Sequence, residues 1–207
     1  MDAKTVLNRI KYRKPTLFNE DKIKKYAILL PLIEKDGETH LLFEVRSMNL
    51  NSQPGDVCFP GGKVDPTDES EKHAALRETI EELGVTSEDI FDVFPLDYMM
   101  PSPDRMIYPF IGRIEEKATI IPNKAEVDEV FTIPLRYFLE TDPEKYDVFI
   151  EAVPADDFPL HLIVGGEDYN WQHRKVTQYF YTYNNYVIWG LTAKIIVNFL
   201  DVLRNNK

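Results

Sequence analysis

Residues 61–85 of this 207-residue chain form the stretch that decides its fold, GGKVDPTDESEKHAALRETIEELGV. The paired glycines at its start break the backbone sharply. After them, the spacing of apolar residues predicts a helix over 70–83. The helix is expected to end at Gly84, because glycine suits the left-handed backbone that follows a helix. On a helical wheel one ridge is expected to face the core, and it consists of Leu76, Ile80 and Leu83.

The opposite side of this helix carries three carboxylates, Glu78, Glu81 and Glu82. Like charges at these spacings repel each other and weaken a helix. One interpretation is a solvated acidic face. The other is a cation site, because a counter-ion would relieve the repulsion and a glycine-rich turn lies directly before the helix. Hard cations such as Mg²⁺ take oxygen ligands and keep waters and phosphate oxygens around them.

Composition limits the classes of protein to which the chain can belong. With 43% hydrophobic and 12% aromatic residues, it can bury a full core as one domain. A formal net charge of −11 argues against nucleic acid or an anionic membrane surface as a partner. No apolar run is long enough to span a membrane. The single cysteine, Cys58, predicts no disulfide framework, a buried thiol and a reduced, cytoplasmic setting.

The rest of the chain predicts strands mixed with a few helices, which indicates an α/β (α+β) fold with a mixed sheet. We expect a polar arm or helix over residues 1–23 and a single domain over 24–207. A hairpin turn is expected at Lys35-Asp36-Gly37. Strands are expected at 26–33, 40–45, 91–99, 107–114, 126–133, 148–153, 160–164 and 177–183.

Two further helices are expected, at 135–140 and at 186–203. The second helix carries an apolar stripe at helical spacing. The stripe predicts either core packing or a homodimer contact, and it consists of Ile188, Leu191, Ile195, Phe199 and Leu203.

The glycine loop and the carboxylate helix resemble the Nudix box. In that pattern a glycine, five residues, a glutamate and seven residues precede Arg-Glu and a later Glu-Glu pair. The second half matches closely, except that Thr79 stands at a position that is usually apolar. In the first half, six residues separate Gly62 from Glu69. Either one residue is inserted in the loop, or Asp68 partly replaces Glu69.

The resemblance implies a Nudix-type α/β/α sandwich that binds Mg²⁺ or Mn²⁺. Glu78 and Glu82 would be metal ligands, and Glu81 would be either a further ligand or the catalytic base. In the wider family the base can also come from a distant loop, and here Glu126 and Glu129 are the outside candidates.

The same resemblance implies structural roles for four other positions, which are Gly61, Gly62, Glu69 and Arg77. Gly61 and Gly62 would shape the loop. Arg77 would hold the loop against the helix by pairing with a carboxylate near Glu69.

The segments before the box are similar to those of the coenzyme A diphosphatase branch of the family. They are residues 41–47, LLFEVRS, and 54–62, PGDVCFPGG, and a later segment at 188–193, IWGLTA, resembles the start of its C-terminal helix. The implied reaction is hydrolysis of coenzyme A or acyl-CoA to 3′,5′-ADP and (acyl-)4′-phosphopantetheine. Arg46 and Lys63 are candidates to bind phosphate, although surface ion pairs would explain them equally well.

Two alternatives stay open at this point. One is a Nudix enzyme for another nucleoside diphosphate derivative, such as ADP-ribose or a dinucleotide. The other is a Nudix-like binding module without catalysis. The retained Glu78, Glu81 and Glu82 argue against the second alternative, because a binding module has no need for carboxylates that repel each other.

Overall fold

The computed structural model describes residues 1–205. Its longest strand, β1 (Lys24–Lys35), is buried on both faces. Leu29 packs in a cluster with helix α2 (Glu71–Leu83), and Leu30 packs in another with helix α4 (Gly190–Asn205). Because successive side chains of a strand point to opposite faces, the two helices lie on opposite sides of the sheet. The continuous apolar run at 26–33 correctly predicts this strand.

A tight turn joins β1 to the antiparallel strand β2 (Glu38–Arg46). Asp36 and Gly37 have φ values of 54° and 77°. Two successive residues with positive φ form the turn that matches the twist of a two-stranded hairpin. The turn predicted at this point is therefore confirmed.

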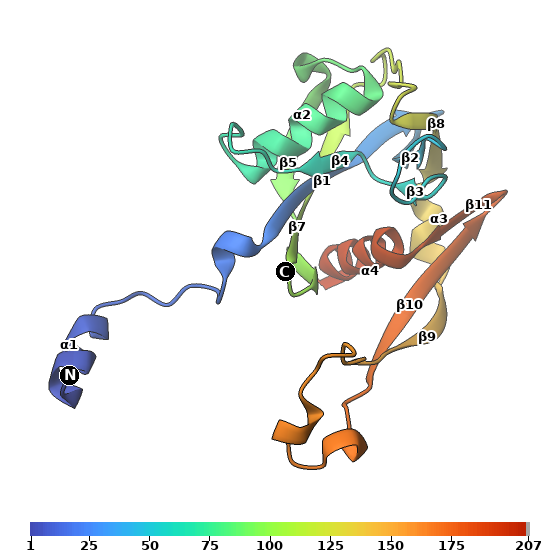
Figure 1. Ribbon diagram of the computed structural model, residues 1–207. Helices are drawn as coiled ribbons and strands as arrows, with labels where there is room; N and C mark the ends of the chain where they lie inside the picture. The colour runs from blue at the N-terminus through green and yellow to red at the C-terminus, as the bar shows by residue number, and fades with distance from the viewer. Residues whose placement is uncertain (206–207) are drawn as a thin grey trace.

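The main sheet is mixed. Strand β1 runs parallel to β7 (Arg105–Ile114) and antiparallel to β2. The central order is β3-β2-β1-β7-β5, while β4 pairs with β1, β6 with β7 and β8 with β2. The remaining bounds are β3 Val57–Cys58, β4 Gly61–Lys63, β5 Ile90–Pro95, β6 Met99–Ser102 and β8 Val127–Pro134. Figure 1 shows α2 and α4 on either side of this sheet, so the predicted mixed α/β layering is confirmed.

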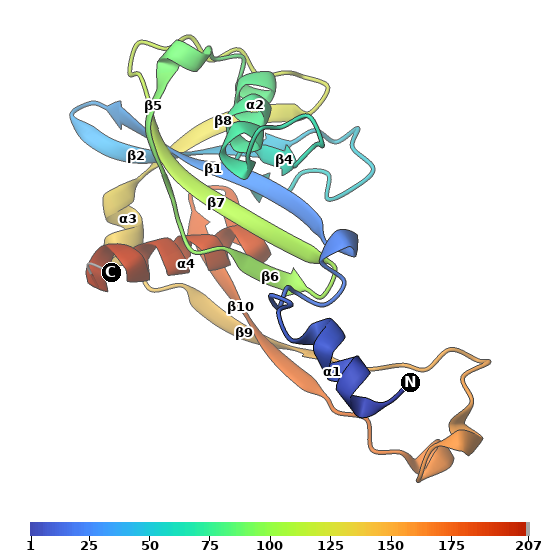
Figure 2. The ribbon, with the colours of Figure 1, turned by 90° about the vertical axis from the view of Figure 1, so that its left-hand side faces the viewer.

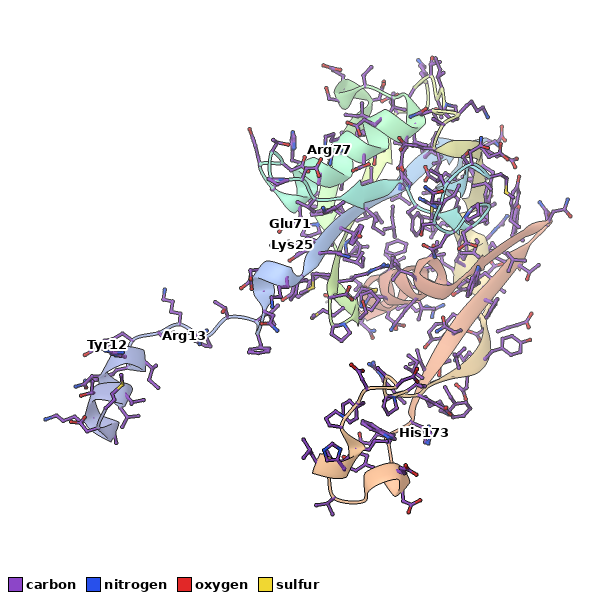
Figure 3. The ribbon with its side chains drawn as sticks, in the orientation of Figure 1. Tyr12, Arg13, Lys25, Glu71, Arg77 and His173 are labelled. Atoms are coloured by element: carbon purple, nitrogen blue, oxygen red, sulfur yellow. The ribbon has the colours of Figure 1, made fainter. Side chains whose placement is uncertain are left out.

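Helix α2 has the predicted ends. Ser70 caps its first turn by accepting a hydrogen bond from the His73 backbone N–H at 3.1 Å, and Gly84 follows its last residue with φ of 68°. Residues of this kind satisfy the free backbone groups at helix ends. A surface ion pair of 3.1 Å between Lys25 and Glu71 links the start of β1 to the start of α2 (Figure 3).

The buried face of α2 matches the expected ridge only in part, since Leu83 is buried and Ile80 packs against its cluster. The residues against the sheet are Ala74, Ala75, Thr79, Glu82 and Leu83, whereas Leu76 and Ile80 are only half-buried. Two alanines allow the helix to approach β1 closely, and this rotates the contact face toward the carboxylates. Thr79 is compatible with the interior because its hydroxyl donates a 2.7 Å hydrogen bond to the Ala75 carbonyl.

A second sheet contains three antiparallel strands, β9 (Glu144–Ile150), β10 (Arg174–Tyr183) and β11 (Tyr186–Trp189). Figure 2 shows the β9–β10 hairpin projecting away from the main sheet. The strand expected at 160–164 is wrong, because Leu160–Leu162 form a 3₁₀ turn within the connection between β9 and β10. Pro159 precedes this turn and two glycines follow it, and residues of these types interrupt extended structure.

The C-terminal helix begins later than expected. Residues 186–189 pair with β10 as strand β11, and α4 starts only at Gly190. Aromatic and β-branched residues dominate 186–189 and favour a strand. Of the predicted stripe, Ile195 and Phe199 are buried in α4 and Ile188 is buried on β11, whereas Leu191 and Leu203 are exposed. The short helix α3 (Leu135–Glu140) has the predicted bounds.

The N-terminal residues lie outside the core. Helix α1 (Ala3–Ile10) has no buried residue, and Figure 1 shows it apart from the main sheet. Residues 1–22 are exposed throughout. No helix within 1–205 has both the length and the apolar character needed to cross a bilayer.

Candidate active site

The paired glycines of β4 lie between β1 and α2. Gly61 and Gly62 pair with Ile28 and Ala27 of β1. A Cβ on Gly61 would collide with the backbone of both β1 residues, and its φ of 149° also disfavours a side chain. A Cβ on Gly62 would collide with the carboxylate of Glu78. Only glycine lets this loop lie so close to both the strand and the helix.

Glu82 and Glu78 point from α2 toward this loop. Glu82 is 4% exposed and accepts a 2.7 Å hydrogen bond from the Gly61 backbone N–H through Oε2. Glu78 lies one turn earlier and packs against Gly62, where it accepts a 3.0 Å hydrogen bond from Arg77. The structure therefore brings together the two glutamates that the sequence assigns to metal binding.

A third carboxylate, Glu44 of β2, joins them, although the sequence assigned it no role. Leu42, two residues earlier, packs against Leu83 and so faces α2. Since side chains two apart in a strand share a face, Glu44 also points toward α2. Its side chain is 1% exposed, with Oε1 accepting a 3.3 Å hydrogen bond from the Cys58 thiol. The alternation of side chains along the strand could have indicated this orientation from the sequence. The role of Glu44 was missed because its neighbours in the sequence are mostly apolar.

The electrostatics of these carboxylates indicate a shortage of positive charge. Burial raises the pKa of Glu82 well above its usual value, and the charge of Glu44 raises it further. Burial likewise raises the pKa of Glu44 and of Glu78. Desolvation and neighbouring like charges both disfavour ionised carboxylates, so a cation at this point would stabilise all three.

Arg77 ties the loop to the helix. Its Nε and Nη2 donate to the two carboxylate oxygens of Asp68 at 3.0 Å each, and Nη2 also donates to the Lys63 carbonyl at 3.2 Å. Figure 3 shows Arg77 on α2. The side chain of Asp68 is 1% exposed. The hydrogen bonds from Arg77 hold the pKa of Asp68 well below its usual range.

The structural role expected of Glu69 falls to Asp68 instead. Glu69 is exposed, and among residues 1–205 it makes no hydrogen bond or ion pair with Arg77. Counted from Gly62, five residues precede Asp68, so the spacing of the first half of the motif is kept. The additional residue lies after Asp68, where the chain turns to the helix cap at Ser70.

Glu81 lies at the edge of the site. Its side chain is 53% exposed and accepts a 3.1 Å hydrogen bond from Arg77. Its position on the rim differs from the half-buried position of Glu78 and the buried position of Glu82. A base that exchanges protons with solvent is compatible with such a position.

Glu129, an outside candidate for the base, lies on the other face of the sheet. Glu129 pairs with Val45 of β2, whose side chain packs on the α4 side of the sheet. Its carboxylate accepts a 2.5 Å hydrogen bond from the Tyr186 hydroxyl. Paired residues share a face, so Glu129 lies on the face opposite to Glu44. It is therefore on the wrong side of the sheet to act with the buried carboxylates.

Glu126, the other outside candidate, lies in the loop directly before β8. It is half-buried, and its charge contributes to the raised pKa of Glu44, Glu78 and Glu82. Its carbonyl accepts a 2.8 Å hydrogen bond from the Ser47 backbone N–H, which anchors the loop before β8 next to the end of β2.

The two basic candidates are available for an anion. Arg46 donates through Nε and Nη2 to the Ser52 carbonyl at 3.3 Å, and Lys63 is exposed on β4. Neither forms an ion pair with another residue within 1–205. Arg46 lies near the carboxylates, because its charge lowers the pKa of Glu44.

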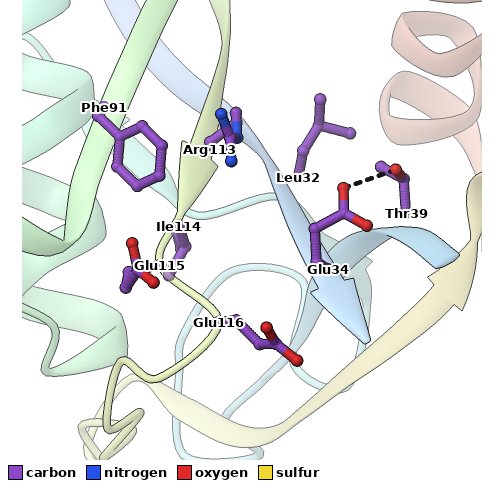
Figure 4. A pocket seen from close by; sticks show the side chains of 8 residues that line it. All are labelled: Leu32, Glu34, Thr39, Phe91, Arg113, Ile114, Glu115 and Glu116. Atoms are coloured by element: carbon purple, nitrogen blue, oxygen red, sulfur yellow. Dashed lines mark hydrogen bonds between the residues drawn. The ribbon is translucent and has the colours of Figure 1, made fainter. Parts of the chain in front are cut away.

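A separate hollow of about 200 Å³ lies away from these residues (Figure 4). There the Thr39 hydroxyl donates a 2.7 Å hydrogen bond to Glu34. Ligand pockets usually enclose about 300–1,000 Å³, so this hollow is small for a nucleotide. It contains none of the candidate site residues and is lined by Leu32, Glu34, Thr39, Phe91, Arg113, Ile114, Glu115 and Glu116.

The buried carboxylates fit a hard divalent cation. They offer only oxygen ligands, and Oε2 of Glu44 is buried without a hydrogen-bond partner in the described chain. As they stand, no three His, Cys, Asp or Glu side chains within 1–205 form a group that could hold an ion. Mg²⁺ usually keeps several waters and takes substrate phosphate oxygens, so an open site of this kind suits it.

Comparison with known proteins agrees with this geometry. A profile of the NUDIX domain matches residues 23–153. The peroxisomal coenzyme A diphosphatase NUDT7 of Mus musculus is 35% identical over 173 residues, which cover 84% of this chain and 67% of that protein. The mitochondrial coenzyme A diphosphatase NUDT8 of Homo sapiens is 34% identical over 183 residues, which cover 86% of this chain and 68% of that protein.

A solved structure extends the similarity to the fold. The MutT/nudix family protein from Enterococcus faecalis aligns with 99% of this chain and 70% of its own, with a TM-score of 0.54 and 17% identity. This likeness shows a shared fold. The chain therefore belongs to the Nudix hydrolases, a family of diphosphatases that act on nucleotide diphosphate substrates and generally use divalent metal ions.

Proposed function

We propose that this protein hydrolyses the diphosphate bond of coenzyme A or acyl-CoA with Mg²⁺ or Mn²⁺. The products would be 3′,5′-ADP and 4′-phosphopantetheine or its acyl derivative. The observation that carries the proposal is the similarity to two coenzyme A diphosphatases over 84% and 86% of the chain. The segments that resemble this branch, 41–47 and 54–62, also lie at the site, because they contain Glu44, Cys58 and both glycines.

The residues of the site divide the work of such a reaction. A bound divalent cation would neutralise the diphosphate and lower the pKa of a bound water. Glu78 and Glu82 would hold it, and the hydrogen bond from Gly61 fixes the orientation of Glu82. A carboxylate would take the proton from the attacking water, and the two candidates are Glu81 on the rim and Glu126 on the loop before β8.

Arg46 and Lys63 would bind the phosphates that the cation leaves uncovered. A guanidinium binds phosphate through two parallel hydrogen bonds, whereas an ammonium acts as a point charge. Both side chains are free of ion pairs within the described residues. They would also reduce the repulsion between an anionic substrate and a protein of net charge −11.

A substrate panel tests the proposal. The purified protein is incubated with Mg²⁺ or Mn²⁺ and with coenzyme A, an acyl-CoA, ADP-ribose or a dinucleoside polyphosphate, and products are identified by chromatography and mass spectrometry. We expect the highest kcat/KM for coenzyme A or the acyl-CoA. Faster hydrolysis of ADP-ribose or the dinucleotide would overturn the proposed substrate. Binding without hydrolysis across the panel would instead support a binding module.

Two further expectations from the sequence can be examined with the same material. For a homodimer, light scattering of the eluted protein would give twice the chain mass of 24.1 kDa. The sequence predicts a cytoplasmic setting, whereas the two relatives are named as peroxisomal and mitochondrial proteins. Fractionation of native cells with an antibody against the chain would decide the compartment.

A further inference from the structure

Glu44 is a buried carboxylate for which the described protein provides almost no partner. Within residues 1–205 the only hydrogen bond to its carboxylate comes from the Cys58 thiol at 3.3 Å, and a thiol is a weak donor. Its second oxygen, Oε2, is inaccessible and has no hydrogen-bond partner within residues 1–205. Buried polar atoms are almost always hydrogen-bonded, so an unpartnered carboxylate oxygen requires an explanation.

Arg46, whose charge lowers the pKa of Glu44, forms its hydrogen bonds elsewhere. Arg46 directs Nε and Nη2 to the Ser52 carbonyl, and no ion pair to Glu44 exists within the described chain. An unpaired ionised carboxylate in a protein interior carries a large free-energy penalty. An apolar residue at this position would avoid the penalty, because Leu42 occupies the same face of β2 at full burial.

The position of Glu44 connects it to the Nudix glutamates. It faces α2 from the sheet, because it shares a face of β2 with Leu42, which packs in one cluster with Leu83 of α2. Its pairing partner on β3 is Cys58, three residues before Gly61, whose N–H binds Glu82. The unpartnered oxygen therefore lies on the strand side of the region that Glu78 and Glu82 line from the helix side.

We propose that Glu44 supplies a carboxylate oxygen to the divalent cation held by Glu78 and Glu82, so that the sheet as well as the helix provides ligands. This inference rests on the proposed metal-dependent function. As they stand, the carboxylates do not form a closed three-ligand group within 1–205, so cation binding requires their side chains to move toward one another. A cation would draw them together and give Oε2 of Glu44 its partner.

The test measures metal binding directly. The wild type, Glu44→Gln and Glu38→Gln are titrated with Mn²⁺, and free Mn²⁺ is quantified by electron paramagnetic resonance. Glu38 is the matched control, because it lies on the same strand and loses the same charge but pairs with Arg136 at the other end of β2. We expect Glu44→Gln to weaken Mn²⁺ binding at least about tenfold and Glu38→Gln to leave it within twofold.

The possible results separate the two proposals. Equal Mn²⁺ affinity of the wild type and Glu44→Gln would overturn this inference and leave the proposed hydrolysis intact. A wild type that binds neither Mn²⁺ nor Mg²⁺ would overturn both. Glu44→Asp keeps the charge on a shorter side chain, so we expect it to bind Mn²⁺ more tightly than Glu44→Gln.

Thermal unfolding excludes a merely structural role. In the absence of metal, Glu44→Gln should melt at or above the temperature of the wild type, because it removes a buried charge without a partner. Mn²⁺ should raise the melting temperature of the wild type more than that of the variant. A metal-free variant that melts lower but gains the same Mn²⁺ shift would show that Glu44 supports the fold only, and the inference would be wrong.

Discussion

The contact between Arg77 and Asp68 allows a prediction that separates two neighbouring carboxylates. Replacing Asp68 by Asn removes a charge that is 1% exposed and that accepts two 3.0 Å hydrogen bonds from Arg77. The Asn side chain keeps one oxygen acceptor but cannot accept both bonds. The corresponding replacement of Glu69 by Gln changes an exposed carboxylate that does not contact Arg77.

The expected loss of stability in Asp68→Asn follows from the surroundings of the Arg77–Asp68 ion pair. Removing one partner of a fully buried ion pair costs about 3–5 kcal/mol. Arg77 is 25% exposed and keeps its bonds to Glu78, Glu81 and the Lys63 carbonyl, so part of this loss is recovered. We expect Asp68→Asn to lower the free energy of unfolding by about 2 kcal/mol, which corresponds to about 4–8 °C in Tm for a domain of this size.

Urea and thermal unfolding of the metal-free protein measure this difference. Glu69→Gln is the matched control and should change stability by no more than about 0.5 kcal/mol. If Glu69→Gln destabilises the protein as much as Asp68→Asn does, the assignment of the motif carboxylate to Asp68 is refuted. A loss below about 0.5 kcal/mol for Asp68→Asn would show that the contact does not stabilise the loop.

Other consequences concern pH and the site itself. The folded-state pKa of Asp68 is lowered, so its ionised carboxylate contributes to the free energy of unfolding above the unfolded pKa of about 3.9, and this contribution is lost as pH falls. In urea titrations, the difference in the free energy of unfolding between the wild type and Asp68→Asn should therefore shrink below about pH 4. Gly62→Ala should reduce kcat at least about tenfold, because its Cβ would displace the Glu78 carboxylate; unchanged kinetics would contradict the close packing. Glu82→Gln should lower kcat/KM at least about 100-fold by removing a proposed metal ligand, while its metal-free Tm should not fall. Glu129→Gln should retain kcat/KM within about twofold, and a tenfold loss would return Glu129 to the candidates for the base.

Local signals in the sequence predicted the elements that local chemistry controls. The ends of α2 were predictable, because a capping serine and a left-handed glycine act within a few residues of the helix. The β1–β2 turn was predictable for the same reason. The boundary at Gly190 was missed, since residues 186–189 become a strand only through pairing with β10.

Tertiary packing determined what the sequence could not predict. The wheel placed Leu76 and Ile80 in the core because they are large and apolar. In the structure, Ala75 and Thr79 face the sheet, since small residues let α2 approach β1 closely. This rotation buries Glu82, so the same packing that contradicted the predicted core face creates the low-exposure environment of the site.

The outcomes for Glu44 and Glu129 have a common physical origin. Glu44 is paired with Val130 and Glu129 with Val45, so the two glutamates lie on neighbouring strands but on opposite faces. The sequence shows which residues of a strand share a face. It does not show which face meets α2, because this depends on how the sheet is assembled. Only Leu42, which packs with Leu83, identifies the Glu44 face as the side of the Nudix glutamates.

The buried carboxylates oppose folding in the absence of a cation, and the surrounding structure compensates for them. Apolar side chains pack on both faces of β1 and β2, while Arg77 and Asp68 hold the glycine loop against α2 from outside. A ligand that binds only the folded state stabilises it according to its concentration and affinity. Metal binding should therefore raise the stability of this protein, and the increase should become smaller as Glu82 or Glu44 is neutralised by substitution.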